Sequence, residues 1–239
     1  MTKEVWRQAA RTTIPVLFGY IAIGIPAGLM IVDAGYPWWL APVMSVTMYA
    51  GAGQYMAAGL FATGASLGTI ALTELLLNIR HLFYGFSLLT KFTAAGAWKV
   101  PLIFLLTDET YSLLTTTAPP EQVPPGRYYA VIALLDWSYW IIGSTIGAVA
   151  GTVLPFNFAG VDFALTALFA VLLMDQIEQT HDISSAAIGA LVTVGMILLA
   201  RLGVLPPEHI LLASLTCGIV VLIIRHRADL HRTAEEHRG

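Results

Sequence analysis

Two adjacent acids stand out in the segment TDETYSLLT, Thr107 to Thr115, because charged residues are rare in this chain. On a helix, Asp108 shares one polar face with three further side chains, those of Tyr111, Ser112 and Thr115. Glu109 points elsewhere, toward a membrane interface if the segment is embedded in lipid. Adjacent carboxylates oppose each other's ionisation, and so does burial. Both acids are therefore candidates to exchange a proton near neutral pH.

A second polar set lies in ELLLNIRHLFYG, residues 74–85. One stripe of a continuous helix contains Glu74, Asn78, His81 and Gly85. Arg80 lies off this stripe, so it either pairs with an acid on another helix or extends to the interface. A charge at the bilayer centre costs about 3 kcal/mol or more, so such residues are functional candidates. A structural ion pair between helices is the alternative.

The segment YAGAGQY contains Gly51 and Gly53 beside Gln54. Two glycines separated by one residue do not line one helix face, so they favour a locally unwound segment. Unwound backbone at membrane depth is tolerated where it faces protein or a water-filled cavity. A break here would offer main-chain polar groups and Gln54 to a zwitterion. The alternative is close helix packing, which we expect for the spaced glycines Gly24, Gly28, Gly143, Gly147 and Gly151.

Asp136 is a further acid inside an apolar segment and a candidate buried charge. The aromatic residues that follow it are interpreted as an interfacial belt: Trp137, Tyr139 and Trp140. The sequence contains no Walker A loop, H-E-x-x-H, G-x-S-x-G or Cys/His ligand spacing. Nothing therefore assigns ATP hydrolysis, proteolysis, a metal site or a cofactor. We expect no enzyme activity, and transport is the class that remains.

The elements that carry these residues are embedded in lipid. The chain is 57% hydrophobic and 11% charged, with a mean hydropathy of +0.74, whereas soluble domains are about a quarter charged. Several uncharged runs approach the roughly 20 residues that span a bilayer core. We predict an all-α, polytopic integral membrane protein with six to eight transmembrane elements and broken helices. The elements are expected at residues 13–32, 37–62, 66–90, 100–117, 128–151, 158–176, 183–200 and 209–225.

The chain is interpreted as a single membrane domain, 1–239, with a polar, loosely ordered cytoplasmic tail at 226–239. Four prolines in residues 119–127 mark its midpoint. The segment IGIPAG recurs as IGAVAG 123 residues later. One interpretation is therefore that residues 13–117 and 128–225 are the two halves of an internal repeat. Repeated halves with broken helices are common in secondary transporters.

Basic residues near both ends place both termini in the cytoplasm, which requires an even number of crossings. Eight crossings leave Lys91 and Lys99 outside. If 37–62 and 158–176 instead re-enter, six crossings remain and these lysines lie inside. The uncharged run 34–73 is long enough for two spans and slightly favours eight elements.

Four segments, in this order, make the chain resemble the AzlC family of bacterial branched-chain amino acid exporters. They are GYIAIGIPAGL, YAGAGQY, LLNIRHLFYGFSL and LTDETYSL. The resemblance implies an inner-membrane exporter of valine, leucine, isoleucine or related amino acids such as methionine. It also implies a small AzlD-like membrane subunit as partner. The family usually has a more basic stretch than TKFTAAGAWK after the third element.

The resulting hypothesis is alternating access around a midplane site. The backbone at Gly51, Gly53 and Gln54 would bind the substrate carboxylate. Asn78 and Tyr84 would complete the polar contacts, and Asp108 would attract the ammonium group. Proton coupling is open among the acids and His81. The alternative is a channel-like or scaffold subunit whose buried charges only assemble a complex. The full set of candidate buried charges is Glu74, Arg80, His81, Asp108, Glu109 and Asp136.

Overall fold

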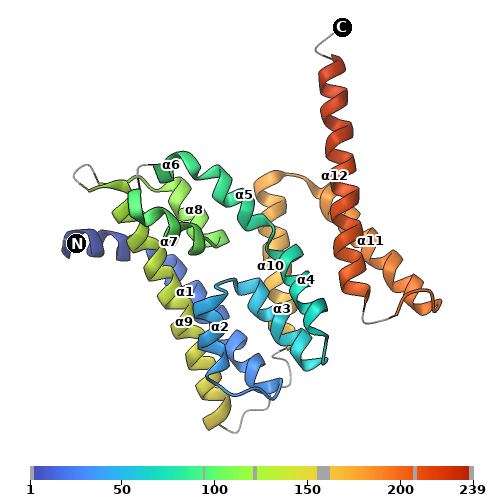
Figure 1. The fold of residues 1–239 in the computed structure, drawn as a ribbon, viewed down its shortest axis with the longest axis horizontal. Coiled ribbons are helices and arrows are strands. Elements are labelled where there is room, and N and C mark those ends of the chain that lie inside the picture. The colour runs from blue at the N-terminus through green and yellow to red at the C-terminus, as the bar shows by residue number, and fades with distance from the viewer. Residues whose placement is uncertain (1–2, 94, 121–122, 155–161, 207–208, 237–239) are drawn as a thin grey trace. The chain divides into compact units, whose positions relative to one another are not determined.

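The computed structural model describes residues 3–93, 95–120, 123–154, 162–206 and 209–236 (Figure 1). Helices and turns make up these residues, with no strand among them, so the predicted all-α class is confirmed. The chain divides into two units, residues 1–64 with 78–168, and residues 65–77 with 169–239. The helices of the first unit are α1 (Lys3–Asp33), α2 (Leu40–Thr47), α3 (Gly51–Ala62), α5 (Arg80–Ser87), α6 (Leu89–Thr93), α7 (Lys99–Phe104), α8 (Asp108–Thr116) and α9 (Pro125–Val153), with a 3₁₀ turn, η1 (Gly96–Trp98).

The long helices α1 and α9 pack side by side and run in the same direction (Figure 1). Near their N-terminal ends, the Thr12 and Tyr128 hydroxyls are 3.0 Å apart. Further along both helices, Gly24 lies against Gly143. Because the contacts move toward the C-terminal ends of both helices together, the two helices are parallel. Both helices are long and apolar enough to cross a membrane.

Glycine makes this close approach feasible. A Cβ atom added at Gly28 would lie 1.9 Å from the Ser144 carbonyl oxygen, and one at Gly147 would lie 1.9 Å from that of Ile25. Only hydrogen fits at these positions, since the two backbones are in direct contact. The packing role predicted for these glycines is confirmed.

The predicted element 37–62 is a broken hairpin, α2 and α3, whose break at residues 48–50 confirms the expectation of a discontinuous helix here. At its open end, the rings of Tyr36 and Phe61 are 5.0 Å apart. Tyr36 follows the C-terminal end of α1 closely in the chain. The tip lies against Trp140, near the middle of α9. The hairpin therefore enters from the C-terminal end of the α1–α9 pair and returns to it.

The predicted element 66–90 is not one continuous helix, because the chain turns at Ile79 and again at Leu88. The first break has a local cause. The His81 ring Nδ1 bonds the Asn78 carbonyl oxygen at 3.1 Å, while the Leu82 amide donates to Ile79 instead. A histidine thus replaces the helical partner of that carbonyl. The helix predicted to carry Glu74, Asn78, His81 and Gly85 as one polar stripe is therefore interrupted between α4 and α5.

The predicted element 100–117 is also a broken hairpin, α7 and α8, with its break at residues 105–107. Before it, Ala95 packs on Gly126 in the first turn of α9. After it, the Thr117 carbonyl accepts a hydrogen bond from the Tyr129 hydroxyl at 3.4 Å. Both ends of this hairpin therefore lie at the N-terminal end of α9. The sequence pattern predicts one continuous element here and gives no sign of the break.

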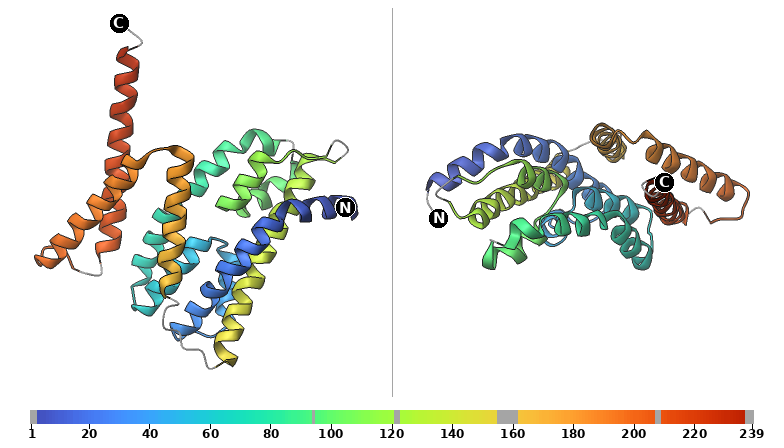
Figure 2. Two further views of the ribbon diagram at one scale, coloured as in Figure 1. Left: turned by 180° about the vertical axis from the view of Figure 1, so that it is seen from behind. Right: turned by 90° about the horizontal axis from the view of Figure 1, so that it is seen from above.

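The two hairpins enter the first unit from opposite ends of the α1–α9 pair (Figures 1 and 2). Between them, the chain passes from Phe61 at one end to Lys91 at the other, where the Lys91 ammonium lies over the Tyr129 ring. Because α1 and α9 are parallel, the chain between them must cross the membrane an odd number of times. This parity is met when 37–62 and 100–117 both re-enter and also when all three predicted elements cross, and it is violated when only 37–62 re-enters.

The remaining helices are α4 (Leu67–Asn78), α10 (Asp162–Thr180), α11 (Ile183–Arg201) and α12 (Ile210–Glu236). In the second unit, Asp182 caps α11 by accepting from the Ser185 amide, and it pairs with Arg225 of α12 at 3.3 Å. Helix α12 continues through residues 226–236, so the loosely ordered tail expected there is wrong up to Glu236. Good helix formers in this stretch explain the continuation. The first residues predicted for the sixth element, 158–161, lie outside the described residues.

Candidate functional site

The tip of the α7–α8 hairpin places two acids at the start of a helix. The Thr107 side chain caps α8 by accepting a hydrogen bond from the Thr110 amide at 3.2 Å. Asp108 and Glu109 are the first two residues of α8. The partial positive charge of a helix N-terminus stabilises carboxylates in this position. The local sequence therefore builds a short, capped half-helix whose N-terminal turn carries the acids.

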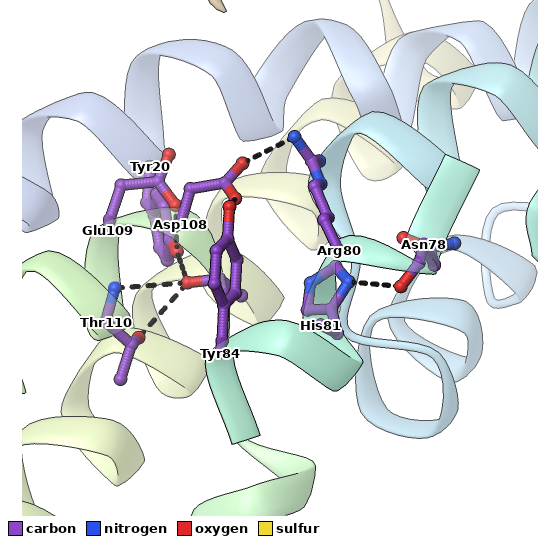
Figure 3. Close-up of polar contacts among 9 residues, drawn as sticks. Tyr20, Asn78, Arg80, His81, Tyr84, Asp108, Glu109 and Thr110 are labelled. Atoms are coloured by element: carbon purple, nitrogen blue, oxygen red, sulfur yellow. Dashed lines mark hydrogen bonds and ion pairs between the residues drawn. The ribbon is translucent and has the colours of Figure 1, made fainter. Parts of the chain in front are cut away.

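Both carboxylate oxygens of Asp108 are engaged by α5 (Figure 3). The Arg80 guanidinium pairs with Oδ2 at 2.9 Å, and the Tyr84 hydroxyl donates to Oδ1. The Arg80 and Asp108 side chains remain 31% and 25% exposed, so the pair is only partly covered by the protein. Of the two alternatives for Arg80, pairing with an acid on another helix is the one observed.

Glu109 points away from Arg80 and toward α1. Its Oε2 accepts a hydrogen bond of 2.8 Å from the Tyr20 hydroxyl (Figure 3). The same hydroxyl lies 2.6 Å from the Thr107 Oγ1. Tyr20 is buried near the middle of the 31-residue helix α1. Glu109 is therefore at the hairpin tip, beside the middle part of α1 and not beside either end of that helix.

Asp136 of α9 is fully buried at the same tip. Its Oδ2 accepts from the Thr110 hydroxyl at 3.0 Å, and the Thr110 oxygen in turn accepts from the Thr107 hydroxyl at 3.1 Å. Among the described residues, Asp136 Oδ1 has no hydrogen-bond partner, and its carboxyl group has no ion pair. A continuous chain of hydroxyl groups thus connects Glu109 with Asp136.

Gln54 lies deep in the α2–α3 hairpin with its side chain fully buried. Its Oε1 accepts from the Trp140 indole at 2.8 Å, and its Nε2 donates to the Ala41 carbonyl at 3.1 Å. Its backbone amide donates to Ala50 within the first turn of α3. Every polar group of Gln54 is therefore used inside the protein, and this placement gives its predicted substrate contact no support.

The other predicted glycines lie in the first turn of α3. Gly51 packs on the Trp140 ring, and both Gly51 and Gly53 are helical, so the unwound residues are the ones just before them. There, Tyr49 adopts a positive φ of 42°, and its hydroxyl is buried with no hydrogen-bond partner among the described residues. The break thus lies in the predicted segment, but its unwound residues include Tyr49 and Ala50 and exclude Gly51 and Gly53.

The aromatic residues after Asp136 do not form an interfacial belt, so that prediction is wrong. Trp140 is 1% exposed and is bonded to Gln54. Trp137 donates to the Ser45 carbonyl at 3.1 Å, and the Tyr139 hydroxyl lies 3.1 Å from that of Thr13. These side chains hold α1 and the α2–α3 hairpin against α9.

The remaining candidates are divided between the two units. His81 and Asn78 lie beside the Asp108 cluster, and the His81 ring contacts that of Tyr84 edge to face. Glu74 belongs to the second unit and is not described with this site. Sequence reasoning missed Tyr20, Thr107 and Thr110. A Thr-x-x-Thr spacing around the two acids was the available signal, because it places a cap and a second hydroxyl on one turn.

Comparison with known proteins identifies the family of this chain. A family model described as AzlC protein matches residues 15–154, which contain both hairpins and α9. An uncharacterized membrane protein of Helicobacter pylori is 36% identical over 222 residues, covering 92% of this chain and 95% of the relative. The branched-chain amino acid transport protein AzlC of Bacillus subtilis is 34% identical over 201 residues, covering 82% and 78%.

The inner membrane protein YgaZ of Escherichia coli is 28% identical over 231 residues, which cover 91% of this chain and 89% of that protein. No solved structure matches the chain. The Helicobacter pylori and Escherichia coli relatives are named as membrane proteins, and the Bacillus subtilis relative is named as a transport protein. The family match over more than half of the sequence, and relatives above 30% identity along most of it, show that this multi-pass membrane protein belongs to the AzlC family.

Proposed function

We propose that this protein exports branched-chain or related apolar amino acids, such as valine, leucine, isoleucine and methionine, across the bacterial inner membrane. It would act by proton-coupled alternating access together with a small AzlD-like subunit. Family membership and the name of the Bacillus subtilis relative support amino acid transport. The observation that carries the proposal is the partly exposed Arg80–Asp108 ion pair, whose acid lies at the tip of a broken hairpin.

An amino acid zwitterion has charges that match those of this pair. A guanidinium binds a carboxylate through two parallel hydrogen bonds, so Arg80 suits the substrate carboxylate. Asp108 then receives the ammonium group, with Tyr84 as a further hydroxyl partner. In the absence of substrate the two side chains neutralise each other, which avoids an isolated charge in lipid. This assignment keeps the predicted role of Asp108. It moves carboxylate binding from the backbone at Gly51, Gly53 and Gln54 to Arg80.

The broken hairpins supply the elements that alternating access requires. Half-helices that meet near mid-membrane are typical of secondary transporters, in which one bundle rocks against another around a fixed site. Here Arg80 and Tyr84 lie on α5, while Asp108 lies on α8. Relative movement of these two helices would open or close the pair. Export as the direction of movement comes from the family alone.

The alternative, a scaffold or channel whose charges serve assembly, is also compatible with one ion pair between α5 and α8. Transport measurements in inside-out membrane vesicles containing both subunits separate the two. We expect labelled leucine to exchange with unlabelled leucine and to accumulate when the vesicle interior is acidified. A passive channel equilibrates leucine but builds no gradient, and a scaffold moves none.

Variants of the ion pair sharpen the test. Asp108→Asn should abolish exchange, whereas Asp33→Asn, which makes the same change at an exposed acid at the end of α1, should leave it intact. The double variant Arg80→Asp with Asp108→Arg restores an ion pair but reverses the positions of its two charges. Assembly without transport in this double variant supports substrate binding. Full transport in it would instead favour a purely structural pair.

A further inference from the structure

A chain of hydroxyl groups links two acids that the substrate pair does not use. It begins at Glu109 and ends at Asp136, 3.0 Å beyond the last hydroxyl. We propose that these two acids share a single proton, which passes between them along the chain and is the proton that drives transport. The proposal rests on the proposed function for its coupling role, but not for the shared proton itself. The intervening hydroxyls belong, in order, to Tyr20, Thr107 and Thr110.

The number of protons that the chain needs supports a shared proton. The chain contains four oxygen–oxygen contacts, of 2.8, 2.6, 3.1 and 3.0 Å, all within hydrogen-bonding range. Each contact needs one proton, but the three hydroxyl groups supply only three. If both carboxyl groups were ionised, one contact would bring two unprotonated lone pairs together. A fourth proton, on either Glu109 or Asp136, completes the chain.

The chain then has two arrangements in which every contact contains one proton. With the proton on Asp136, each group donates toward Glu109; with the proton on Glu109, each donates toward Asp136. Conversion breaks the O–H bond of one acid and forms that of the other, while each hydroxyl releases one proton and gains another. The total charge of the chain stays at one negative unit, so no oxidant, reductant or further reactant is needed.

The surroundings favour this pair of acids over Asp108. Asp108 is neutralised by Arg80, whereas neither Glu109 nor Asp136 has a cationic partner among the described residues. Burial of an unpaired carboxylate is costly, and a single shared proton halves the charge that must be buried. The other titratable groups facing the chain are few: Tyr49 beside Asp136, and Asp108 with its partners Arg80 and Tyr84.

The proton-carrying acid Glu109 is directly bonded in sequence to Asp108, the acid proposed to bind the substrate. Asp108 and Glu109 are consecutive residues in the first turn of α8. Any movement of α8 that separates Asp108 from Arg80 also moves Glu109 relative to Tyr20 of α1. Substrate binding and the integrity of the hydroxyl chain therefore depend on the same helix.

Infrared spectroscopy of the purified protein tests the shared proton without any transport. At neutral pH we expect a carbonyl band of a protonated carboxylic acid in the wild type. The double variant Glu109→Gln with Asp136→Asn should lose this band, whereas Asp108→Asn should keep it. A wild-type protein without the band, or a band that persists in the double variant, would overturn the proposal.

Transport in the vesicles described above tests the coupling. Thr110→Val interrupts the chain with a side chain of the same shape, and Thr110→Ser retains the hydroxyl. We expect the valine variant to exchange leucine but to lose acid-driven accumulation, and the serine variant to retain both. Acid-driven accumulation at the wild-type level in Thr110→Val would refute the relay. If the wild type exchanges no amino acid, the proposed function fails while the infrared result still decides the shared proton.

Discussion

The contact between α1 and α9 should not tolerate a methyl group at Gly28. In the Gly28→Ala variant, the added Cβ would lie 1.9 Å from the Ser144 carbonyl oxygen and 2.6 Å from the Ala148 amide nitrogen. Both atoms are backbone, so no side-chain rotation relieves the clash. The two helices must separate for the variant to fold.

The required separation follows from ordinary contact distances. Carbon and oxygen atoms approach to about 3.3 Å, so the helices must move apart by about 1.4 Å at this point. Overpacking of this kind costs about 1–3 kcal/mol, and sometimes more. The same separation pulls Tyr20 on α1 away from the acids near α9, so we expect transport to fall together with stability.

The effect is measured by thermal unfolding in detergent, monitored as the loss of monodisperse protein. Gly19→Ala is the matched control, because the same helix carries it and no atom lies within 4 Å of the added Cβ. We expect the control to melt like the wild type, or slightly higher because alanine favours helix. Equal melting temperatures for Gly28→Ala and Gly19→Ala would show that α1 and α9 are not in backbone contact.

Three further predictions concern other parts of the chain. Gln54→Leu leaves the buried Trp140 indole without its acceptor and should cost about 1–3 kcal/mol, and adding Trp140→Phe should recover part of this loss in melting experiments. Hydrogen bonds from Ser184 and Ser185, with Arg225 nearby, hold the pKa of Asp182 well below its ordinary value. A carboxyl with a lowered pKa stabilises the fold above the unfolded-state pKa of about 4, and this contribution disappears as the pH falls through the folded-state value. The melting-temperature loss of Asp182→Ala should therefore be constant from about pH 8 to pH 5, and a loss that varies across that range would contradict the assignment. Finally, single cysteines at Thr63 and Thr116, in a Cys217→Ala background, should react with a membrane-impermeant reagent from opposite sides, with Thr116 on the cytoplasmic side; labelling from one side would exclude the two opposed hairpins.

The helical, membrane-embedded class of this protein was predictable from composition, since the scarcity of charge leaves no soluble alternative. The glycines that pack helices were also predictable, because a four-residue spacing places Gly24 and Gly28 on one face whatever that face meets. The break before Gly51 was predictable for a similar reason, because two glycines separated by one residue do not lie on one packing face. Short-range spacing was enough for each of these conclusions.

The partner of each polar residue became known from the packing of the helices and was not predictable from spacing. Gln54 and Trp140 are far apart in sequence, and their hydrogen bond removed one from the substrate site and the other from an interfacial belt. The same holds for Glu109, whose partner Tyr20 precedes it by 89 residues. A charge in lipid must find a partner, but periodicity shows only the face on which it lies. The partner is selected when separate helices pack, because the burial cost is offset only by the groups that arrive there.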